Sequence, residues 1–332
     1  MKKKIALLLT IFTAILCLYG CNKEEPKYTI TFEVNGGTEV ESVTTSFLSY
    51  KPIPAKKDYY FENWYYNADF TGNPVVFPVK PTKNMTLYAK FREGIFDYTL
   101  NNDGTVTITN LLNCHLNKDV VIPNNITING TNYPVKNVNI TSINHSWLKS
   151  LSFENVQIDK LLISGEGIET IDLSKLSNIE KLQITGCVNL TSLTLPSVKV
   201  IPPSFITICN KIEKITIPSS VTTIKANSFA NNGRLKTITF ENGSLLKTIG
   251  DSAFSNTSIE SINLSSTVTR LYQNSFKNCS SLKAVTLNST EVLALDNVFV
   301  NYNKDLVIYV PDPLLEEYKT QNTKLNFNKI TA

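Results

Sequence analysis

The sequence predicts a mostly β protein in which a small β module precedes a long solenoid of stacked coils. Asparagine accounts for 37 of the 332 residues, about 11% of the chain, and asparagine favours turns over helix interiors. Between these turn formers the chain repeats a short apolar pattern, Leu-x-x-Leu-x-Leu in its simplest form. A pattern that recurs in this way is typical of repeat architectures, in which each coil buries its apolar edge against its neighbours.

The composition argues against several functional classes. The formal net charge is +4, and removal of an N-terminal leader that contains Lys2, Lys3 and Lys4 would lower it to +1. A nearly neutral protein without a basic block has no electrostatic drive toward phosphate backbones, so no nucleic-acid partner is expected. The chain has only two histidines, His115 and His145, which leaves few groups for general-base catalysis or metal binding.

Residues 1–21 have the form of a bacterial export signal that ends in a cysteine. A basic start is followed by an apolar run at 5–19, which is short for a membrane span but suits a signal peptide. The ending Leu18-Tyr19-Gly20-Cys21 resembles the lipobox of bacterial lipoproteins, in which the cysteine thiol carries lipid. The resemblance implies attachment to a membrane through Cys21. The alternative is a secretory leader that happens to contain a cysteine.

Residues 22–27 form a short tether after this cysteine. The motif Lys23-Glu24-Glu25 looks like a surface-export signal of lipoproteins in one Gram-negative phylum, and an ordinary charged linker is the alternative. We therefore expect a lipid-anchored protein of the bacterial cell envelope that is exposed on the surface, on the outer membrane if the cell is Gram-negative.

Residues 28–92 predict a small aromatic β module. Residues 28–34 alternate apolar and polar side chains, Asn35-Gly36-Gly37 suits a tight hairpin turn, and a second strand is expected near 40–45. This order of parts resembles the internalin-type B-repeat, a β-grasp-like module of bacterial surface proteins. The matching segments are Thr31-Phe32-Glu33-Val34-Asn35-Gly36-Gly37, Phe61-x-x-Trp64-Tyr65 and Thr86-Leu87-Tyr88-Ala89-Lys90-Phe91.

Two residues of this module carry specific expectations. Trp64 is expected in the core, because a module of about 65 residues needs large aromatic side chains to build one. A ligand-stacking pair of Phe61 and Trp64 is the alternative. Asn63 stands where the B-repeat family usually has glycine, and we expect it to adopt the left-handed conformation in place of that glycine.

A repeat region occupies residues 148–305, after a linker at 93–96 and an N-terminal cap at 97–147. The triads begin 10 or 11 residues apart at first and 22 to 24 apart later, so about eight coils of 20–24 residues account for both. In the later part the second half of a coil changes to a Val-x-x-Ile pattern followed by phenylalanine. Residues 306–332 form the C-terminal cap. The triads begin at Leu148, Ile158, Ile168, Ile179, Leu190, Ile212, Leu235, Ile259 and Leu282, and the phenylalanines are Phe205, Phe229, Phe254, Phe276 and Phe299.

This period and triad indicate a leucine-rich-repeat solenoid, and the later repeats resemble its BspA-like class. The resemblance rests on Ile215-Thr-Ile-Pro-Ser-Ser-Val-Thr-Thr-Ile-Lys-Ala-Asn-Ser-Phe229 and on Ile249-Gly-Asp-Ser-Ala-Phe254, with cap-like segments at 96–108 and 309–319. It implies an extracellular protein associated with adhesion and host contact, without one ligand that the class shares.

Three cysteines fall at one position of the repeat. Cys187, Cys209 and Cys279 each lie three residues before a triad, and Asn232 and Asn256 hold the same position. We expect this position to face inward, where thiols are buried and amides satisfy backbone groups. A Cys187–Cys209 disulfide between adjacent coils is the alternative, and Cys114 is left unassigned.

No catalytic site, metal site or cofactor is predicted. His145 and Ser146 are adjacent in the sequence, but no acid or oxyanion donor accompanies them. No Cys/His spacing fits zinc, and no glycine-rich loop suits a phosphate.

The candidate binding surface is the outward face of the main strands, a flat face of Ser, Thr and Asn without aromatic residues. It is either a solvated face of good β-formers or a broad contact face for an unidentified extracellular protein or glycan. The predicted function is that of a non-enzymatic surface lipoprotein that mediates adhesion or macromolecular binding. The alternative is an envelope structural or accessory lipoprotein that holds a glycan or partner for another complex. The candidate residues are Thr170, Asp172, Ser192, Thr194, Lys214, Thr216, Thr237, Thr239, Ser261, Asn263 and Thr286.

Overall fold

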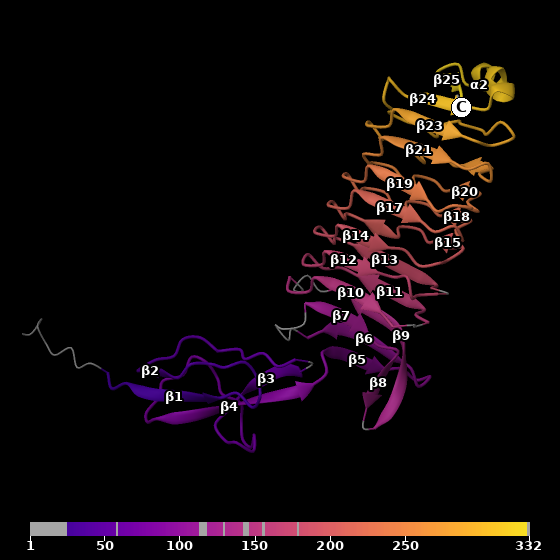
Figure 1. The fold of residues 1–332 in the computed structure, drawn as a ribbon. Coiled ribbons are helices and arrows are strands. Elements are labelled where there is room, and N and C mark those ends of the chain that lie inside the picture. Colours follow the sequence, from indigo (N-terminus) through magenta and orange to yellow (C-terminus); the bar gives the residue numbers. More distant parts are fainter. Residues whose placement is uncertain are drawn as a thin grey trace, which may run out of the picture. The chain divides into compact units, whose positions relative to one another are not determined.

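The structure, a computed structural model, describes residues 25–57, 59–112, 118–128, 130–141, 146–154, 157–177 and 179–330. The chain divides between Glu93 and Gly94 into two compact units, each described here by itself (Figure 1). The leader with Cys21, the unassigned Cys114 and both histidines lie outside the described residues. Within the described ranges, no helix has the length and apolar character that a bilayer crossing requires.

The first unit is a four-stranded mixed sheet in the order β2–β1–β4–β3. Strands β1 and β4 are parallel, and the other two pairs are antiparallel. Trp64 is fully buried, as expected, and its indole N–H donates to the carbonyl of Pro52 at 2.7 Å. The ring centroids of Phe32 and Phe61 lie 5.0 and 5.5 Å from that of Trp64. The strands are β1 (Tyr28–Glu33), β2 (Val43–Thr45), β3 (Tyr59–Tyr65) and β4 (Met85–Glu93).

The expectation for Asn63 is wrong, and the reason lies in the spacing of its neighbours. Phe61 and Trp64 are both buried although they are three positions apart, and a regular strand would direct them to opposite faces. The pairing of β3 with β4 shifts between Phe61 and Asn63. A β-bulge at Glu62, with no left-handed residue at Asn63, brings both rings to one side.

The tight hairpin expected after residue 34 is also modified. Asn35 and Gly36 have positive φ, at 46° and 81°, and the amide of Gly37 donates to the carbonyl of Val34. The chain then pairs briefly with a distant segment, through Thr38 and Ala55, before it returns as β2. The turn therefore forms, but nine residues separate β1 from β2.

The second unit begins with two antiparallel hairpins. β5 (Phe96–Leu100) pairs with β6 (Val106–Leu111), and β8 (Asn125–Ile128) pairs with β9 (Thr131–Ile140). β6 runs parallel to β9. Because β9 continues in parallel to β11, and β7 (Asp119–Ile122) to β10, this cap leads directly into the coils.

The coils form a solenoid with one continuous series of parallel strands, which we call the main strand row. It consists of two sheets, in the orders β7–β10–β12–β14 and β17–β19–β21–β23–β24–β25. Ser150 pairs with Thr170, and Thr237 pairs with Ser261, 20 and 24 residues apart, which matches the predicted coil length. The strands are β10 (Ser150–Phe153), β12 (Thr170–Asp172), β14 (Ser192–Thr194), β17 (Lys214–Ile217), β19 (Thr237–Phe240), β21 (Ser261–Leu264), β23 (Ala284–Leu287), β24 (Val307–Val310) and β25 (Asn326–Lys329).

The other sides of the coils differ along the chain. In the early coils β9, β11, β13 and β16 are adjacent, whereas the later coils form the sheet β15–β18–β20–β22. The C-terminal cap adds a 3-10 helix, η1 (Asp312–Leu314), and the helix α2 (Leu315–Gln321). The remaining strands are β11 (Lys160–Ile163), β13 (Lys181–Thr185), β15 (Val200–Ile201), β16 (Ile206–Thr207), β18 (Thr223–Ile224), β20 (Thr248–Ile249) and β22 (Arg270–Leu271).

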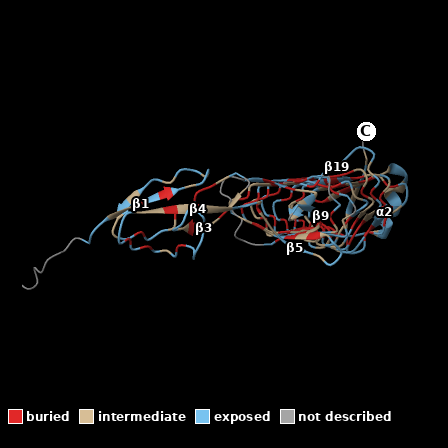
Figure 2. Ribbon diagram, turned by 90° about the horizontal axis from the view of Figure 1, so that it is seen from below, coloured by how far each residue is buried: buried red, intermediate tan, exposed pale blue. Residues whose placement is uncertain are grey.

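One apolar core runs through the whole solenoid, and exposed residues alternate with buried ones along the strands (Figure 2). The second residue of every triad in the main strand row is buried, from Leu151 to Val285. In the later coils the five phenylalanines form a ladder with centroid separations of 5.3 to 5.9 Å, stacked except at its first step. Burial of one stripe per coil is what makes each coil depend on its neighbours.

Candidate functional site

The structure places all eleven candidate residues on the main strand row, between β12 and β23. Their side chains point away from the core because the alternate residues of each strand are buried. Nine of them are exposed, whereas Thr239 and Thr286 are half-buried. The sequence therefore located this surface, and whether it binds a partner stays a prediction.

Neighbouring side chains on this face bond to one another across the coils. The hydroxyls of Thr216 and Thr239 lie 2.9 Å apart and share a hydrogen bond. The carboxylate of Asp172 accepts a bond from the backbone amide of Ser174 and so helps to end its strand. Lys214 forms no ion pair within the part of the chain that the structure describes, and it is the one cation among the candidates.

Besides the break between the two sheets, at β14 and β17, the face is interrupted between β19 and β21. β17 pairs with β19, and β21 pairs with β23, through four residues each, but the pairing of β19 with β21 is confined to Thr237 and Ser261. The coil between these two strands is the longest of the later ones. Its residues 241–244 form a loop in which Gly243 has φ of +74°. The extra chain length separates the far ends of the strands.

A hollow of about 420 Å³ lies at this opening. It brings together two predicted residues, Thr239 and Asn263, with two that sequence reasoning missed, Phe240 and Asn288. The amide of Asn288 donates to the side-chain oxygen of Asn263 at 2.7 Å and to the carbonyl of Leu264 at 2.8 Å. Phe240 differs in the sequence from its counterpart one coil earlier, because it stands at the end of the triad where that coil has the aliphatic Ile217.

The chemistry of this hollow suits recognition more than catalysis. Glu241 is the titratable residue among its lining residues, and its carboxylate already accepts the backbone amide of Ser219 at 2.9 Å. The described residues contain no group of three His, Cys, Asp or Glu side chains placed to hold a metal. Hydroxyl and amide groups beside a partly covered aromatic ring can bind a polar partner, but they supply no nucleophile with an activating base.

The inward cysteines are free and buried, as expected for Cys187, Cys209 and Cys279. A hydrogen bond with the neighbouring Cys187 thiol, together with burial, raises the pKa of the Cys209 thiol. Burial raises the pKa of the Cys279 thiol. The thiols of Cys209 and Cys279 are therefore poor nucleophiles, because the thiolate is the reactive form, whereas the same hydrogen bond lowers the pKa of the buried Cys187 thiol.

The two asparagines assigned to the same inward position behave differently. Asn232 is fully buried: its amide donates to the carbonyls of Ile206 and Phe229, and its oxygen accepts the amide of Cys209. Asn256 is exposed, so the expectation for it is wrong. Thr257 takes the inward place instead and contacts the Cys279 sulfur at 3.4 Å.

Burial raises the pKa of Tyr318 and lowers that of Lys51, and several other displaced pKa values belong to exposed turns and pairs. Hydrogen bonds from Thr71 and Thr105 lower the pKa of Asp69 and Asp103. A hydrogen bond from Lys149 lowers the pKa of Glu169. None of these groups faces a hollow on the main strand row, so the pKa values indicate no acid–base site there.

Comparison with known protein families identifies both units. The BspA type leucine rich repeat region (6 copies) matches residues 156–283 and 199–314, and the Listeria-Bacteroides repeat domain matches residues 28–90. No curated protein matches the chain.

Solved structures with detectable likeness come from several bacteria. A leucine-rich repeat protein of Bacteroides ovatus is 15% identical, with 72% of this chain and 76% of that chain covered and a TM-score of 0.36. The leucine rich repeat protein TpLRR of T. pallidum is 18% identical, with 72% and 96% covered and a TM-score of 0.28. The pneumococcal vaccine antigen PcpA is 12% identical, with 71% and 97% covered and a TM-score of 0.27.

Proposed function

From a chain that carries a BspA-type leucine-rich repeat region after a Listeria-Bacteroides repeat domain, we propose a non-enzymatic, lipid-anchored protein of the bacterial surface. In this proposal the main strand face mediates adhesion by holding an extracellular macromolecule, and Cys21 carries the lipid. The protein uses no cofactor and no metal.

The observation that carries the proposal is a long polar face built on one buried core. Six strands from β12 to β23, separated by about 4.8 Å each, give the candidate residues a length of about 24 Å. A standard interface of about 800 Å² per partner is of similar extent, roughly 30 Å across. The candidate face holds no aromatic platform for a sugar, which favours a protein over a glycan as the partner here.

The opening at Thr239 and Asn263 gives this face a place for specificity. Strongly binding residues of an interface cluster where a side chain fills a hollow and excludes water. The half-buried ring of Phe240 forms an apolar part of the hollow, and the amides of Asn263 and Asn288 provide fixed polar groups beside it. One protruding side chain of a partner fits this arrangement.

Binding by this face can be tested with paired substitutions. The double variant Thr216→Arg/Asn263→Arg changes exposed residues of the main strand row, while Thr223→Arg/Thr248→Arg makes the same change on β18 and β20 as a control. Both proteins would be measured against immobilised host matrix proteins by surface plasmon resonance. We expect the first variant to bind at least about tenfold more weakly than wild type, and the control to keep its affinity. Equal losses in both variants would refute a role specific to this face.

The surface location and the anchor are tested on cells. Protease added to intact cells is expected to release the solenoid, and Cys21→Ala is expected to leave the membrane fraction. Digestion only after permeabilisation would contradict the adhesion role and favour the accessory envelope role. A Cys21→Ala protein that stays with the membrane would contradict lipid attachment.

A further inference from the structure

The sheet on the side away from the main strand row ends one coil early. β22 is its last strand, although residues 291–299 form another coil after it. Leu271 precedes Phe276 by five residues, as in the two coils before it, but Leu295 precedes Phe299 by only four, a spacing shared by Ile201 and Phe205 at the other end of this sheet. The shortened segment forms no strand.

The cap draws the shortened segment away from β22. The backbone amide of Leu293 donates to the hydroxyl of Tyr318, a fully buried residue of α2, at 2.9 Å. Arg270 and Tyr272 bond backward, to the carbonyls of Lys247 and Ile249. In a parallel sheet, successive residues direct their backbone groups toward opposite neighbouring strands. Leu271 lies between Arg270 and Tyr272, so its backbone N–H and C=O point toward the open edge of the sheet.

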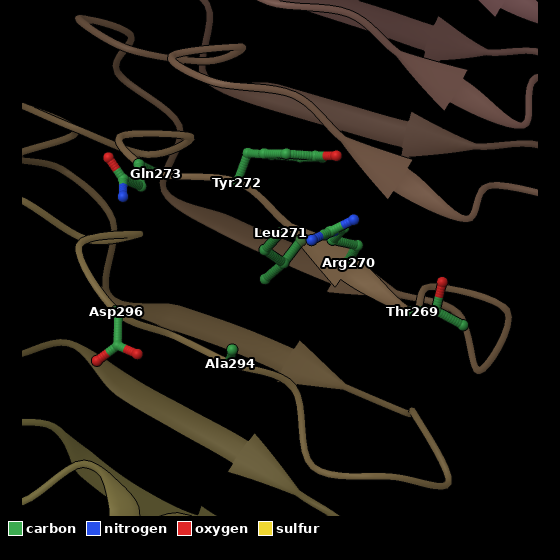
Figure 3. Close-up of a pocket in the computed structure, with 7 residues that line it drawn as sticks. All are labelled: Thr269, Arg270, Leu271, Tyr272, Gln273, Ala294 and Asp296. Atoms are coloured by element: carbon green, nitrogen blue, oxygen red, sulfur yellow. The ribbon is translucent and has the colours of Figure 1, made fainter.

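A hollow of about 520 Å³ occupies this edge (Figure 3). Arg270, Tyr272 and Gln273 project from the segment of β22, and Asp296 and Ala294 come from the shortened coil beside it. The hollow therefore lies where the last segment on this side, which forms no strand, leaves the edge of β22 unpaired.

Two residues at this edge differ from those of the preceding coils. The positions of Arg270 and Tyr272 are held by Thr248 and Gly250 one coil earlier. The guanidinium lies over the Tyr272 ring, 4.8 Å from its centroid, in a cation–π contact. Within the described part of the chain Arg270 takes part in no ion pair, and 41% of Tyr272 is exposed. The Arg270 guanidinium is thus held in place by the Tyr272 ring, and its N–H groups can donate hydrogen bonds to a ligand.

We propose that this hollow is a binding site for a neutral saccharide. Sugar hydroxyls both donate and accept hydrogen bonds, and the site offers both kinds of group: Arg270 and Gln273 donate, Asp296 accepts, and Leu271 does both through its backbone. The exposed part of the Tyr272 ring offers an amphipathic surface to the C–H face of a sugar ring. One cation and one anion leave the lining without net charge, which favours a neutral over an acidic sugar.

The length of β22 excludes the main competing ligand class. An extended peptide that adds to a sheet edge gains its affinity from a series of main-chain hydrogen bonds. β22 has two residues, and one of them faces the open edge. A compact ligand bound mainly by side chains fits this edge better than a strand does.

The test titrates the purified protein with cellotetraose, xylotetraose, maltotetraose and chitotetraose, followed by NMR chemical shifts. We expect at least one of them to bind with Kd of about 1 mM, as suits an open site. Tyr272→Ala and Arg270→Gln should weaken it at least about tenfold, and Tyr272→Phe, which keeps the ring, much less. The matched control is Lys225→Ala, an exposed residue in the column of Tyr272 two coils earlier.

The outcomes separate this site from the main strand face. The Thr216→Arg/Asn263→Arg variant should keep its affinity for the saccharide, so a failure of the adhesion proposal leaves this one standing. The inference is refuted if no tetrasaccharide binds at about 10 mM, or if Tyr272→Ala binds as well as Lys225→Ala while both melt like wild type. Saturable binding of a polar peptide pool without any saccharide would also overturn it.

Discussion

The early and late coils of the solenoid differ in how the second half of each coil packs against its neighbours. From Leu148 to Leu195 each half of a coil carries an aliphatic triad, and strands of three to five residues form on both sides. From Ile212 to Phe299 only the main strand row keeps strands of four residues, while β18, β20 and β22 have two each. The core runs unbroken through both parts.

The difference is explained by what fills the second half of a coil. In the late coils a phenylalanine occupies the core, and the backbone turns sharply on both sides of it. Left-handed residues stand two before and two after the ring: Asn227 and Asn231 flank Phe229, and Asn274 and Asn278 flank Phe276. Asparagine tolerates this conformation better than other residues with a Cβ. The comparison teaches that aromatic volume and asparagine turns replace strand pairing as the link between coils.

The largest expected effect comes from removing a ring in the middle of the ladder. Phe254 stacks on Phe229 and Phe276 at 5.3 and 5.5 Å, so Phe254→Ala leaves a cavity that two coils line. We expect a loss of about 3–5 kcal/mol in the free energy of unfolding, measured by urea denaturation.

Two variants show whether the ladder acts as a unit. Phe254→Leu keeps most of the volume and should cost about 1–1.5 kcal/mol. Phe299→Ala removes the last ring, which has one ring neighbour and is 6% exposed, and should cost less than Phe254→Ala. Equal costs at Phe254 and Phe299 would show that stacking contributes nothing beyond burial.

The next largest effect is expected from Asn232, whose buried side-chain amide lies where the early coils give way to the late ones. Asn232→Ala leaves two buried carbonyls and the Cys209 amide without their partner. We expect a loss of about 2–3 kcal/mol by thermal or urea denaturation. The matched change Asn256→Gly removes an exposed amide without the strain that alanine would carry at the φ of 57° found there, and should cost less than half as much. A similar cost for both would mean that burial of Asn232 is irrelevant to its contribution.

Asn232 and Asn256 also show which parts of the structure could be predicted from the sequence. The apolar triads fix which residues face inward, so the coils, their length, the polar face and Asn232 could be predicted. Asn256 could not be placed by counting back from the next triad, because its coil has one residue fewer between Phe254 and Ile259 than the preceding coil has between Phe229 and Leu235. Counting from the phenylalanine would have selected Thr257.

The parts that sequence reasoning missed arise from such length differences. The opening beside Phe240 lies at the longest of the later coils, and the hollow beside Tyr272 lies next to a segment that forms no strand. A periodic pattern averages over these irregularities. The bulge at Glu62 is similar, since only the burial of both Phe61 and Trp64 reveals the shift in register.

A smaller effect is expected from the asparagine turns that distinguish the late coils. Asn278 has φ of 59°, and its amide donates to Asn256 while its oxygen accepts from Asn301. Asn278→Ala places a Cβ in the left-handed region without the side-chain bonds and should cost about 1–2 kcal/mol. Asn278→Gly removes the same bonds without the strain and should cost about half as much. If both variants lose the same free energy of unfolding in urea denaturation, the contribution of Asn278 comes from its side-chain bonds to Asn256 and Asn301 and not from its backbone conformation.

The smallest effect is a pH dependence that arises from the late-coil thiol. Burial raises the pKa of Cys279 in the folded state, so the unfolded thiol, with pKa of about 8.5, ionises first as the pH rises. The unfolded state then holds fewer protons, and the free energy of unfolding falls by up to about 1.4 kcal/mol per pH unit until the folded thiol also titrates. Cys279→Ala should show a shallower decline between about pH 8 and 9.5 than wild type, whatever its starting stability. Parallel curves for the two proteins would mean that this thiol ionises equally in both states, and that the late core around Phe254 and Phe276 admits water.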